Sequence, residues 1–147
     1  MRKQVFGRKF SRDKGSRQAL FRSLIKAFIA NGKIETTKAR AKAIAGEIDK
    51  IVTSTKGSNI VSAKRKVLSF LANDRKTTEF LFKNVTPAFA ERKSGFTKIT
   101  YLPRRMGDGA EMARLEWVVE IKTEEEKSKK KEKKVEPKSK KEVKAKK

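Results

Sequence analysis

Two adjacent arginines, Arg104 and Arg105, are the side chains of this sequence best suited to recognise another molecule. A guanidinium group presents paired N–H donors that match two oxygens of one phosphate, a geometry that a lysine ammonium lacks. The pair lies near the start of a nine-residue connection, 103–111, which also contains Gly107 and Gly109. Glycines let backbone amides approach a ligand, and they also permit left-handed hairpin turns. Both interpretations are open for the glycines, whereas we expect the two arginines to contact phosphate and not to brace a hairpin.

A second group of candidates lies in the first 42 residues, which carry 13 Lys or Arg against two acids, Asp13 and Glu35. Such residues often form only a solvated helix face, but like charges three or four residues apart destabilise a free helix. This density therefore predicts an external counter-charge, and phosphate fits because its neutralisation releases condensed counterions. With one lysine on a later strand and the arginine pair, the predicted RNA-binding residues are Arg2, Lys3, Arg8, Lys9, Arg12, Lys14, Arg17, Arg22, Lys38, Arg40, Lys42, Lys98, Arg104 and Arg105.

The sequence offers little for catalysis or for metal binding. It contains no cysteine and no histidine, which removes the usual zinc ligand sets and the commonest acid–base group at neutral pH. Glu47 and Asp49 lie two residues apart, on different faces of a predicted helix, and the glutamates at 124–126 have nothing to position them. We therefore predict no enzyme, no cofactor, no metal site and no small-molecule substrate.

Two aromatic residues, Phe96 and Tyr101, have two interpretations. The stretch 93–101 faintly resembles the aromatic strand of sheets that bind single-stranded RNA, but the spacing of its aromatics and the order of the elements differ from that fold. Core packing is therefore the favoured prediction and base stacking the alternative. Trp117 lies in a cleanly alternating strand and is predicted to be a core residue.

The overall charge is strongly positive. Among 147 residues, 40 Lys and Arg face 17 Asp and Glu, a formal charge of +23, which costs folding free energy until an anionic partner neutralises it. No stretch approaches the roughly 18 apolar residues of a membrane-spanning helix, and the first residues lack the apolar stretch of a signal peptide. We predict one domain, a cytoplasmic location and no membrane partner.

Apolar residues at spacings of three and four predict four helices. The first begins at a Ser16 cap and ends at Gly32, the second follows a Thr37 cap, the third spans 59–72, and Asn73 or Asp74 caps the fourth. The side chains predicted to be buried on them, with Phe89 as a further candidate, are Leu20, Phe21, Leu24, Ile25, Phe28, Ile29, Ala41, Ile44, Ala45, Ile48, Ile51, Val52, Ile60, Val61, Val67, Leu68, Leu71, Phe80, Leu81 and Val85.

Three segments have strand character. Residues 33–36 are β-prone, residues 112–122 alternate between apolar and polar side chains, and residues 96–102 are their expected antiparallel partner. In the alternating segment, Val119 and Ile121 are predicted to share the inner face with Trp117. The predicted fold class is α+β, with four helices packed on a small three-stranded sheet in the order α-β-α-α-α-β-β.

Composition changes sharply after residue 122. Residues 123–147 contain 12 lysines, six glutamates and no aromatic residue, too little apolar surface to offset chain entropy. The predicted organisation is a basic arm at 1–15, an RNA-binding α+β domain at 16–122 and a disordered tail at 123–147. A tail that becomes ordered on RNA is the alternative.

Several short motifs resemble the family of the seventeenth large-subunit ribosomal protein of bacteria. They occur in that family's order and spacing across about residues 1–122, and the third in combination with the fourth is the most specific. The motifs are Gly7-Arg8-Lys9-Phe10, Arg17-Gln18-Ala19-Leu20, Gly32-Lys33-Ile34-Glu35-Thr36-Thr37, Arg40-Ala41-Lys42, Gly95-Phe96-Thr97-Lys98-Ile99, Arg105-Met106-Gly107-Asp108 and Glu111-Met112-Ala113.

The resemblance implies a folded body on the RNA of the large subunit, near the peptide exit side, that contacts several RNA segments and neighbouring ribosomal proteins. It implies no catalysis and no cofactor. The expected mechanism is a structural clamp on ribosomal RNA, in which shape and backbone contacts dominate because A-form RNA hides its base edges in a deep groove. A nucleoid protein that prefers duplex DNA and an RNA-modifying enzyme are the two rival hypotheses.

Removal of the tail tests the predicted domain organisation. A chain of residues 1–122 should keep the cooperative melting transition of the full chain, because the apolar periodicity ends at Ile121 and the tail has nothing to pack. Thermal unfolding of both chains, followed by circular dichroism, makes the comparison. Loss of the transition on truncation would show that the tail is structural.

Overall fold

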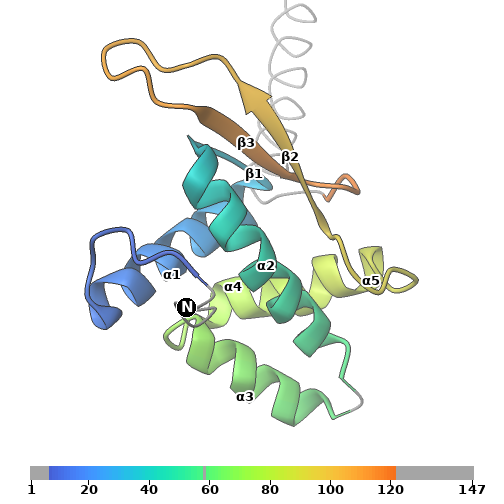
Figure 1. The fold of residues 1–147 in the computed structure, drawn as a ribbon. Helices are drawn as coiled ribbons and strands as arrows, with labels where there is room; N and C mark the ends of the chain where they lie inside the picture. The colour runs from blue at the N-terminus through green and yellow to red at the C-terminus, as the bar shows by residue number, and fades with distance from the viewer. Residues whose placement is uncertain (1–6, 58, 122–147) are drawn as a thin grey trace, which may run out of the picture.

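The computed structural model describes residues 7–57 and 59–121 (Figure 1). Arg2, Lys3 and the predicted tail lie outside the described residues. The elements are α1 (Lys14–Asn31), β1 (Lys33–Thr37), α2 (Lys38–Thr55), α3 (Ile60–Phe70), α4 (Arg75–Phe80), η1 (Leu81–Val85), α5 (Thr86–Ala88), β2 (Thr97–Leu102) and β3 (Met112–Trp117). Because α4, η1 and α5 follow one another without a break, they form one helical segment. The predicted α+β class and the order α-β-α-α-α-β-β are confirmed.

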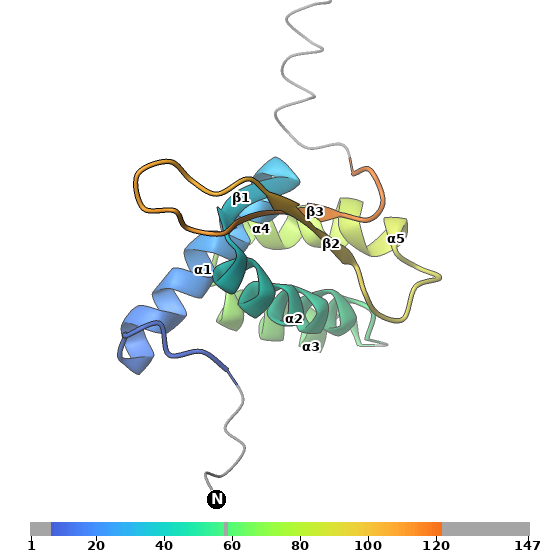
Figure 2. The same ribbon diagram turned by 45° about the horizontal axis from the view of Figure 1, so that its top comes forward.

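The sheet is antiparallel, with β3 between β1 and β2. Helix α2 runs beneath it, so one face of the sheet is covered (Figures 1 and 2). Ala113, Leu115 and Trp117 of β3 are buried on this face. On the other face, the Arg114 guanidinium donates to a Glu35 carboxylate oxygen at 2.7 Å, and Lys98 Nζ lies 3.9 Å from Glu116 Oε1. The alternation of β3 therefore sorts apolar side chains inward and paired charges outward.

Aromatic side chains from distant parts of the chain meet at the centre of the core. The Trp117 ring lies 4.4 Å from Phe28 and 5.6 Å from Phe89 between centroids, and Phe89 lies 5.2 Å from Phe96. Phe96 is fully buried and Trp117 is 8% exposed, so both are core residues, as predicted. For Tyr101 the favoured prediction of core packing is wrong, because the residue is 60% exposed.

Helix ends mostly follow the caps expected from sequence. Gly32 has a left-handed φ of 74° and donates its N–H to the Phe28 carbonyl at 2.8 Å, which ends α1. The carboxylate of Asp74 accepts the Thr77 N–H at 3.2 Å, which starts α4. The predicted start of the first helix is wrong: α1 begins at Lys14, with Asp13 as its N-cap residue. Part of the predicted arm therefore belongs to the helix.

Two apolar faces are shorter in the structure than the sequence predicts. Ile60 and Val61, expected to be buried, are 61% and 60% exposed, and Ala63 is buried in their place. Helix α3 lies at the edge of the helical layer (Figure 1), so only a narrow stripe of it reaches the core. The alternating pattern at 112–122 also predicts a longer strand than the structure has. β3 ends at Trp117, and Val119 beyond it is 39% exposed.

The turn between α3 and α4 is held in a left-handed conformation without glycine. Ala72 and Asn73 have φ values of 53° and 58°, and the Asn73 N–H donates to the Leu68 carbonyl at 2.8 Å. Asparagine tolerates this region, but the Cβ of alanine crowds the following carbonyl. The turn therefore stores strain at Ala72.

Replacement of Ala72 by glycine should raise the free energy of unfolding by ~0.5–1 kcal/mol, because relief of left-handed strain exceeds the added chain entropy. As a control, Ala19→Gly on the exposed side of α1 should lower it by ~1 kcal/mol. Thermal melting measures both. Equal losses of stability in the two variants would contradict the backbone conformation at position 72.

Candidate nucleic-acid interface

The start of α2 meets the end of the 103–111 connection. The Lys38 N–H donates to the Glu111 carbonyl at 2.9 Å, and Lys38 Nζ lies 3.0 Å from Glu111 Oε2. The hydrogen bond and charge of Lys38 hold the pKa of the Glu111 carboxyl below its ordinary value, and the charges of Arg104 and Lys42 lower it further. Three cations therefore gather around one carboxylate. Together with Arg105, we call Lys38, Lys42 and Arg104 the hairpin cluster.

The position of these cations on α2 is unfavourable for an isolated helix. The first turn of α2 contains no acidic residue, although the N-terminal end of a helix carries partial positive charge. Lys38 adds a full positive charge at that end, where its ammonium also lies 5.1 Å from the centre of the Tyr101 ring. An anion bound beside the hairpin cluster would relieve this repulsion.

Arg105 makes a forked pair with Asp108 inside the connection. Its Nε donates to Oδ1 at 3.1 Å and its Nη2 to Oδ2 at 2.5 Å. The hydrogen bond from Arg105 lowers the pKa of the Asp108 carboxyl from its ordinary value to about 2, and the Ala110 N–H adds to the effect. We expected that neither arginine braces the hairpin, and for Arg105 this expectation is wrong. Its contact with phosphate stays a prediction.

Arg104 differs from its neighbour. Its side chain is exposed, and within residues 7–57 and 59–121 it makes no hydrogen bond or ion pair. Gly107 and Gly109 have φ values of 99° and 60°, with open space where a Cβ would stand. Their backbone conformation, which glycine adopts without strain, supports the glycine-turn interpretation of the connection.

The arm and the first turn of α1 carry a second basic group. Phe10 attaches the arm to α1, because its ring packs edge-on against Phe21 at 6.0 Å between centroids. The start of α1 and the hairpin connection project on the same side of the molecule (Figures 1 and 2). We call the five cations before and within this turn the arm group; only Arg17 among them is half-buried, and the group is Arg8, Lys9, Arg12, Lys14 and Arg17.

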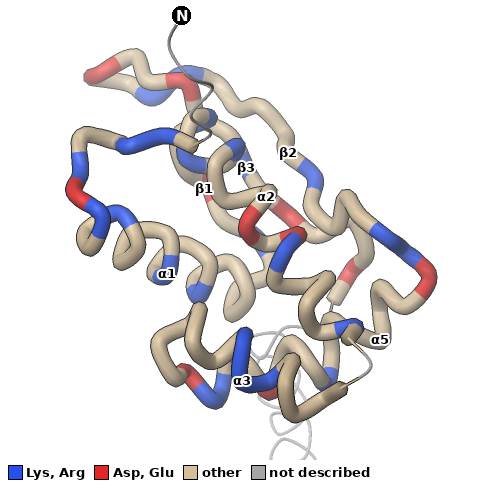
Figure 3. Tube along the Cα trace, turned by 60° about the horizontal axis from the view of Figure 1, so that its bottom comes forward, with Lys and Arg blue, Asp and Glu red and all other residues tan. Residues whose placement is uncertain are grey.

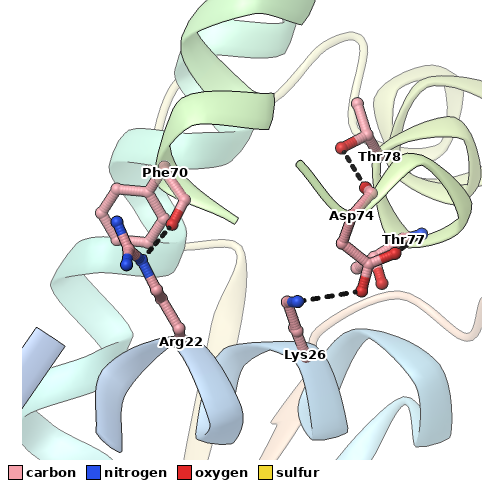
Figure 4. A network of polar contacts seen from close by, with 6 residues as sticks. All are labelled: Arg22, Lys26, Phe70, Asp74, Thr77 and Thr78. Atoms are coloured by element: carbon pink, nitrogen blue, oxygen red, sulfur yellow. Dashed lines mark hydrogen bonds and ion pairs between the residues drawn. The ribbon is translucent and has the colours of Figure 1, made fainter. Parts of the chain in front are cut away.

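Three other predicted residues lie apart from both groups. Arg22 is half-buried, and its Nε donates to the Phe70 carbonyl at 2.9 Å, at the end of α3 (Figure 4). Lys98 lies on the outer face of the sheet beside Glu116. Arg40 is half-buried, two residues after Lys38 and therefore on a different side of α2. The structure does not gather these three with the hairpin cluster.

Sequence reasoning overlooked a group of exposed cations on α3 and at the start of α4. The single acid among them, Asp74, caps α4 and pairs with Lys26 Nζ at 3.2 Å (Figure 4). The signal was the uninterrupted basic run at 64–66, which lies outside the apolar stripe on which the helix prediction depended. The basic colouring of α3 is visible in Figure 3, and the residues are Lys64, Arg65, Lys66, Arg75 and Lys76.

The described surface contains small hollows. One lies between α2 and α3, lined by Glu47, Lys50, Ile51, Ser54, Lys66, Val67 and Phe70. Glu47, the one carboxylate of this lining, pairs with Lys50 there at 2.9 Å. In the part of the chain that the structure describes, no cluster of three acidic, histidine or cysteine side chains is arranged to hold a metal ion. None of its helices has the length and apolar character needed to cross a membrane.

A small basic α+β fold with cations exposed at its loops and helix ends is typical of ribosomal proteins. A family model described as ribosomal protein L17 matches residues 20–118. The chain belongs to the ribosomal protein L17 family, whose members are non-enzymatic structural proteins of the large ribosomal subunit. The predicted family and the prediction of no enzyme are confirmed.

Three bacterial relatives, each named large ribosomal subunit protein bL17, are similar to this chain over nearly their full length. The relative from Natranaerobius thermophilus is 40% identical over 111 residues, which cover 76% of this chain and 96% of the relative. That from Sulfurihydrogenibium sp. is 44% identical over 119 residues, 80% and 97% of the two chains. That from Persephonella marina is 43% identical over 119 residues, 80% and 95%.

The variants Arg22→Ala and Arg17→Ala separate an internal role from a surface role. Arg22→Ala should lower the free energy of unfolding by ~1–2 kcal/mol, because the Phe70 carbonyl loses a charged donor in a partly buried position. Arg17→Ala should change it by less than ~0.5 kcal/mol. Thermal melting decides: equal stability of the two variants would show that the Arg22 contact contributes nothing to the fold.

Proposed function

We propose that this protein binds the ribosomal RNA of the large subunit through contacts with its phosphate backbone, made by the arm group and the hairpin cluster. The observation that supports this most directly is the gathering of Lys38, Lys42 and Arg104 around the single carboxylate of Glu111. These three cations exceed the one carboxylate by two charges, and this surplus favours the binding of a further anion. RNA supplies closely spaced phosphates. Because the chain belongs to a family of large-subunit ribosomal proteins, ribosomal RNA is the anion that we propose as its partner.

Both groups carry a surplus of positive charge, as the exposed cations of α3 and the start of α4 also do. The arm group has five cations and one nearby acid, Asp13, and the hairpin cluster has four cations and two acids, Asp108 and Glu111. Because the two groups project on one side of the body (Figure 2), RNA segments that converge there would be held together. The protein then stabilises one arrangement of folded RNA, which is the action of a clamp.

The outer face of the sheet suits a different neighbour. Four of its charges are paired, Arg114 with Glu35 and Lys98 with Glu116, and only Lys33 adds to them, so this face has little surplus to offer phosphate. We propose it for contacts with neighbouring large-subunit ribosomal proteins. We also propose that the arm, the α+β body and the C-terminal segment act as separate parts, with the body as the folded unit.

The salt dependence of RNA affinity tests the phosphate contacts. Log affinity for purified large-subunit ribosomal RNA should fall linearly with log salt concentration, by about 0.7–0.9 per neutralised phosphate. Arg104→Ala should lower that slope by about 1 and leave folding nearly unchanged. The control Lys83→Ala removes an exposed cation of η1 that pairs with Glu79, outside both groups, and should leave the slope unchanged. A flat salt response of the natural protein would remove the proposal.

Sedimentation distinguishes the proposed function from its rivals. On a sucrose gradient of a cell extract, the protein should migrate with large subunits at one copy per subunit. A nucleoid protein would follow duplex DNA without a fixed ratio. Migration with DNA, or apart from the subunits, would contradict the proposal.

A further inference from the structure

The forked pair of Arg105 and Asp108 leaves part of the guanidinium free. An arginine carries five N–H donors, and the bonds from Nε and Nη2 to the carboxylate use two of them. Three donors remain, two on Nη1 and one on Nη2. Because the guanidinium is planar, the carboxylate at one edge fixes the direction of those that remain. Arg105 is about half exposed, with a side-chain exposure of 54%, so the free edge is accessible.

The backbone around the pair is closed on itself. The Arg105 N–H donates to the Ala110 carbonyl at 3.0 Å, and the Gly109 N–H donates to the Arg105 carbonyl at 3.0 Å. Asp108 Oδ1 also accepts the Ala110 N–H at 3.3 Å. Asp108 therefore holds both the side chain of Arg105 and the turn from which it projects.

We propose that Asp108 is a positioning residue for RNA binding, which holds Arg105 so that its free N–H edge receives one phosphate. This inference rests on the proposed RNA contact. A solvated arginine loses rotamer freedom when it binds phosphate, whereas a guanidinium that is already held loses less. The carboxylate therefore improves binding although its own charge repels phosphate.

Positioning and electrostatic repulsion predict opposite effects on RNA affinity when the Asp108 charge is removed. Loss of an acidic charge beside an RNA site should strengthen binding if charge alone decides. If positioning decides, Asp108→Asn should weaken binding to purified large-subunit ribosomal RNA about three- to tenfold. Glu79→Gln, in α4, changes the net charge equally and pairs only with Lys83 among its described contacts; it should leave affinity unchanged or slightly higher.

A double-mutant cycle separates positioning from general damage. Arg105→Lys keeps the charge but cannot form the fork, so it should weaken binding to a similar extent. In that background, Asp108→Asn should cause no further loss, because the interaction it breaks is already absent. Asp108→Glu, which retains a carboxylate, should recover part of the affinity. Melting temperatures of all variants should agree within a few degrees, since the substitutions lie in an exposed loop.

Titration of the free protein reports on the fork itself. The pair is present above the ordinary pKa of an aspartate and is lost as pH falls through about 2, so the Asp108 carboxyl signal should titrate near that value. In the Arg105→Lys variant it should titrate higher. Normal or stronger RNA binding by a folded Asp108→Asn variant would overturn the inference, and equal further loss in the Arg105→Lys background would do the same. Failure of the natural protein to bind RNA would instead overturn the proposed function.

Discussion

The register of β3 with its two neighbours determines where the basic residues meet. Met112 pairs with Thr37 of β1 and with Leu102 of β2, so β1 and β2 end, and β3 begins, at the same end of the sheet. Lys38 follows Thr37 directly and therefore lies beside Glu111. A slip of one residue would turn Leu115 and the other inner side chains of β3 to solvent. The packing of the core thus fixes the geometry of the hairpin cluster.

Sequence reasoning predicted the elements that local patterns define. Gly32, Asp74 and the apolar stripe of α2 were identified because each acts within a few residues of chain. The pairing of β1 with β3 was not, since Glu35 and Arg114 are 79 positions apart and no local pattern links them. Ile60 and Val61 were misplaced for a related reason: periodicity gives the apolar face of a helix but not the extent of the layer that covers it.

The candidate interface shows the same limit for charged residues. Arg22, Lys26 and Lys56 are as basic as their neighbours, yet each has a partner inside the fold. Lys56 Nζ donates to the Phe89 carbonyl at 2.5 Å, and its ammonium lies 4.6 Å from the centre of the Phe96 ring. Composition predicts that the chain needs anionic partners, but only tertiary structure tells which cations are left to meet them.

The distance in sequence between β1 and its partner also shapes the synthesis of the protein. β1 is complete at Thr37, whereas β3 begins only at Met112. Until translation reaches that strand, one edge of β1 has no hydrogen-bonding partner, and Phe28 and Phe89 lack the indole ring against which they finally pack. Unpaired strand edges and open apolar surface both promote aggregation of nascent chains. The interval between the completion of α5 and the emergence of β3 is therefore when a growing chain is most vulnerable to misfolding.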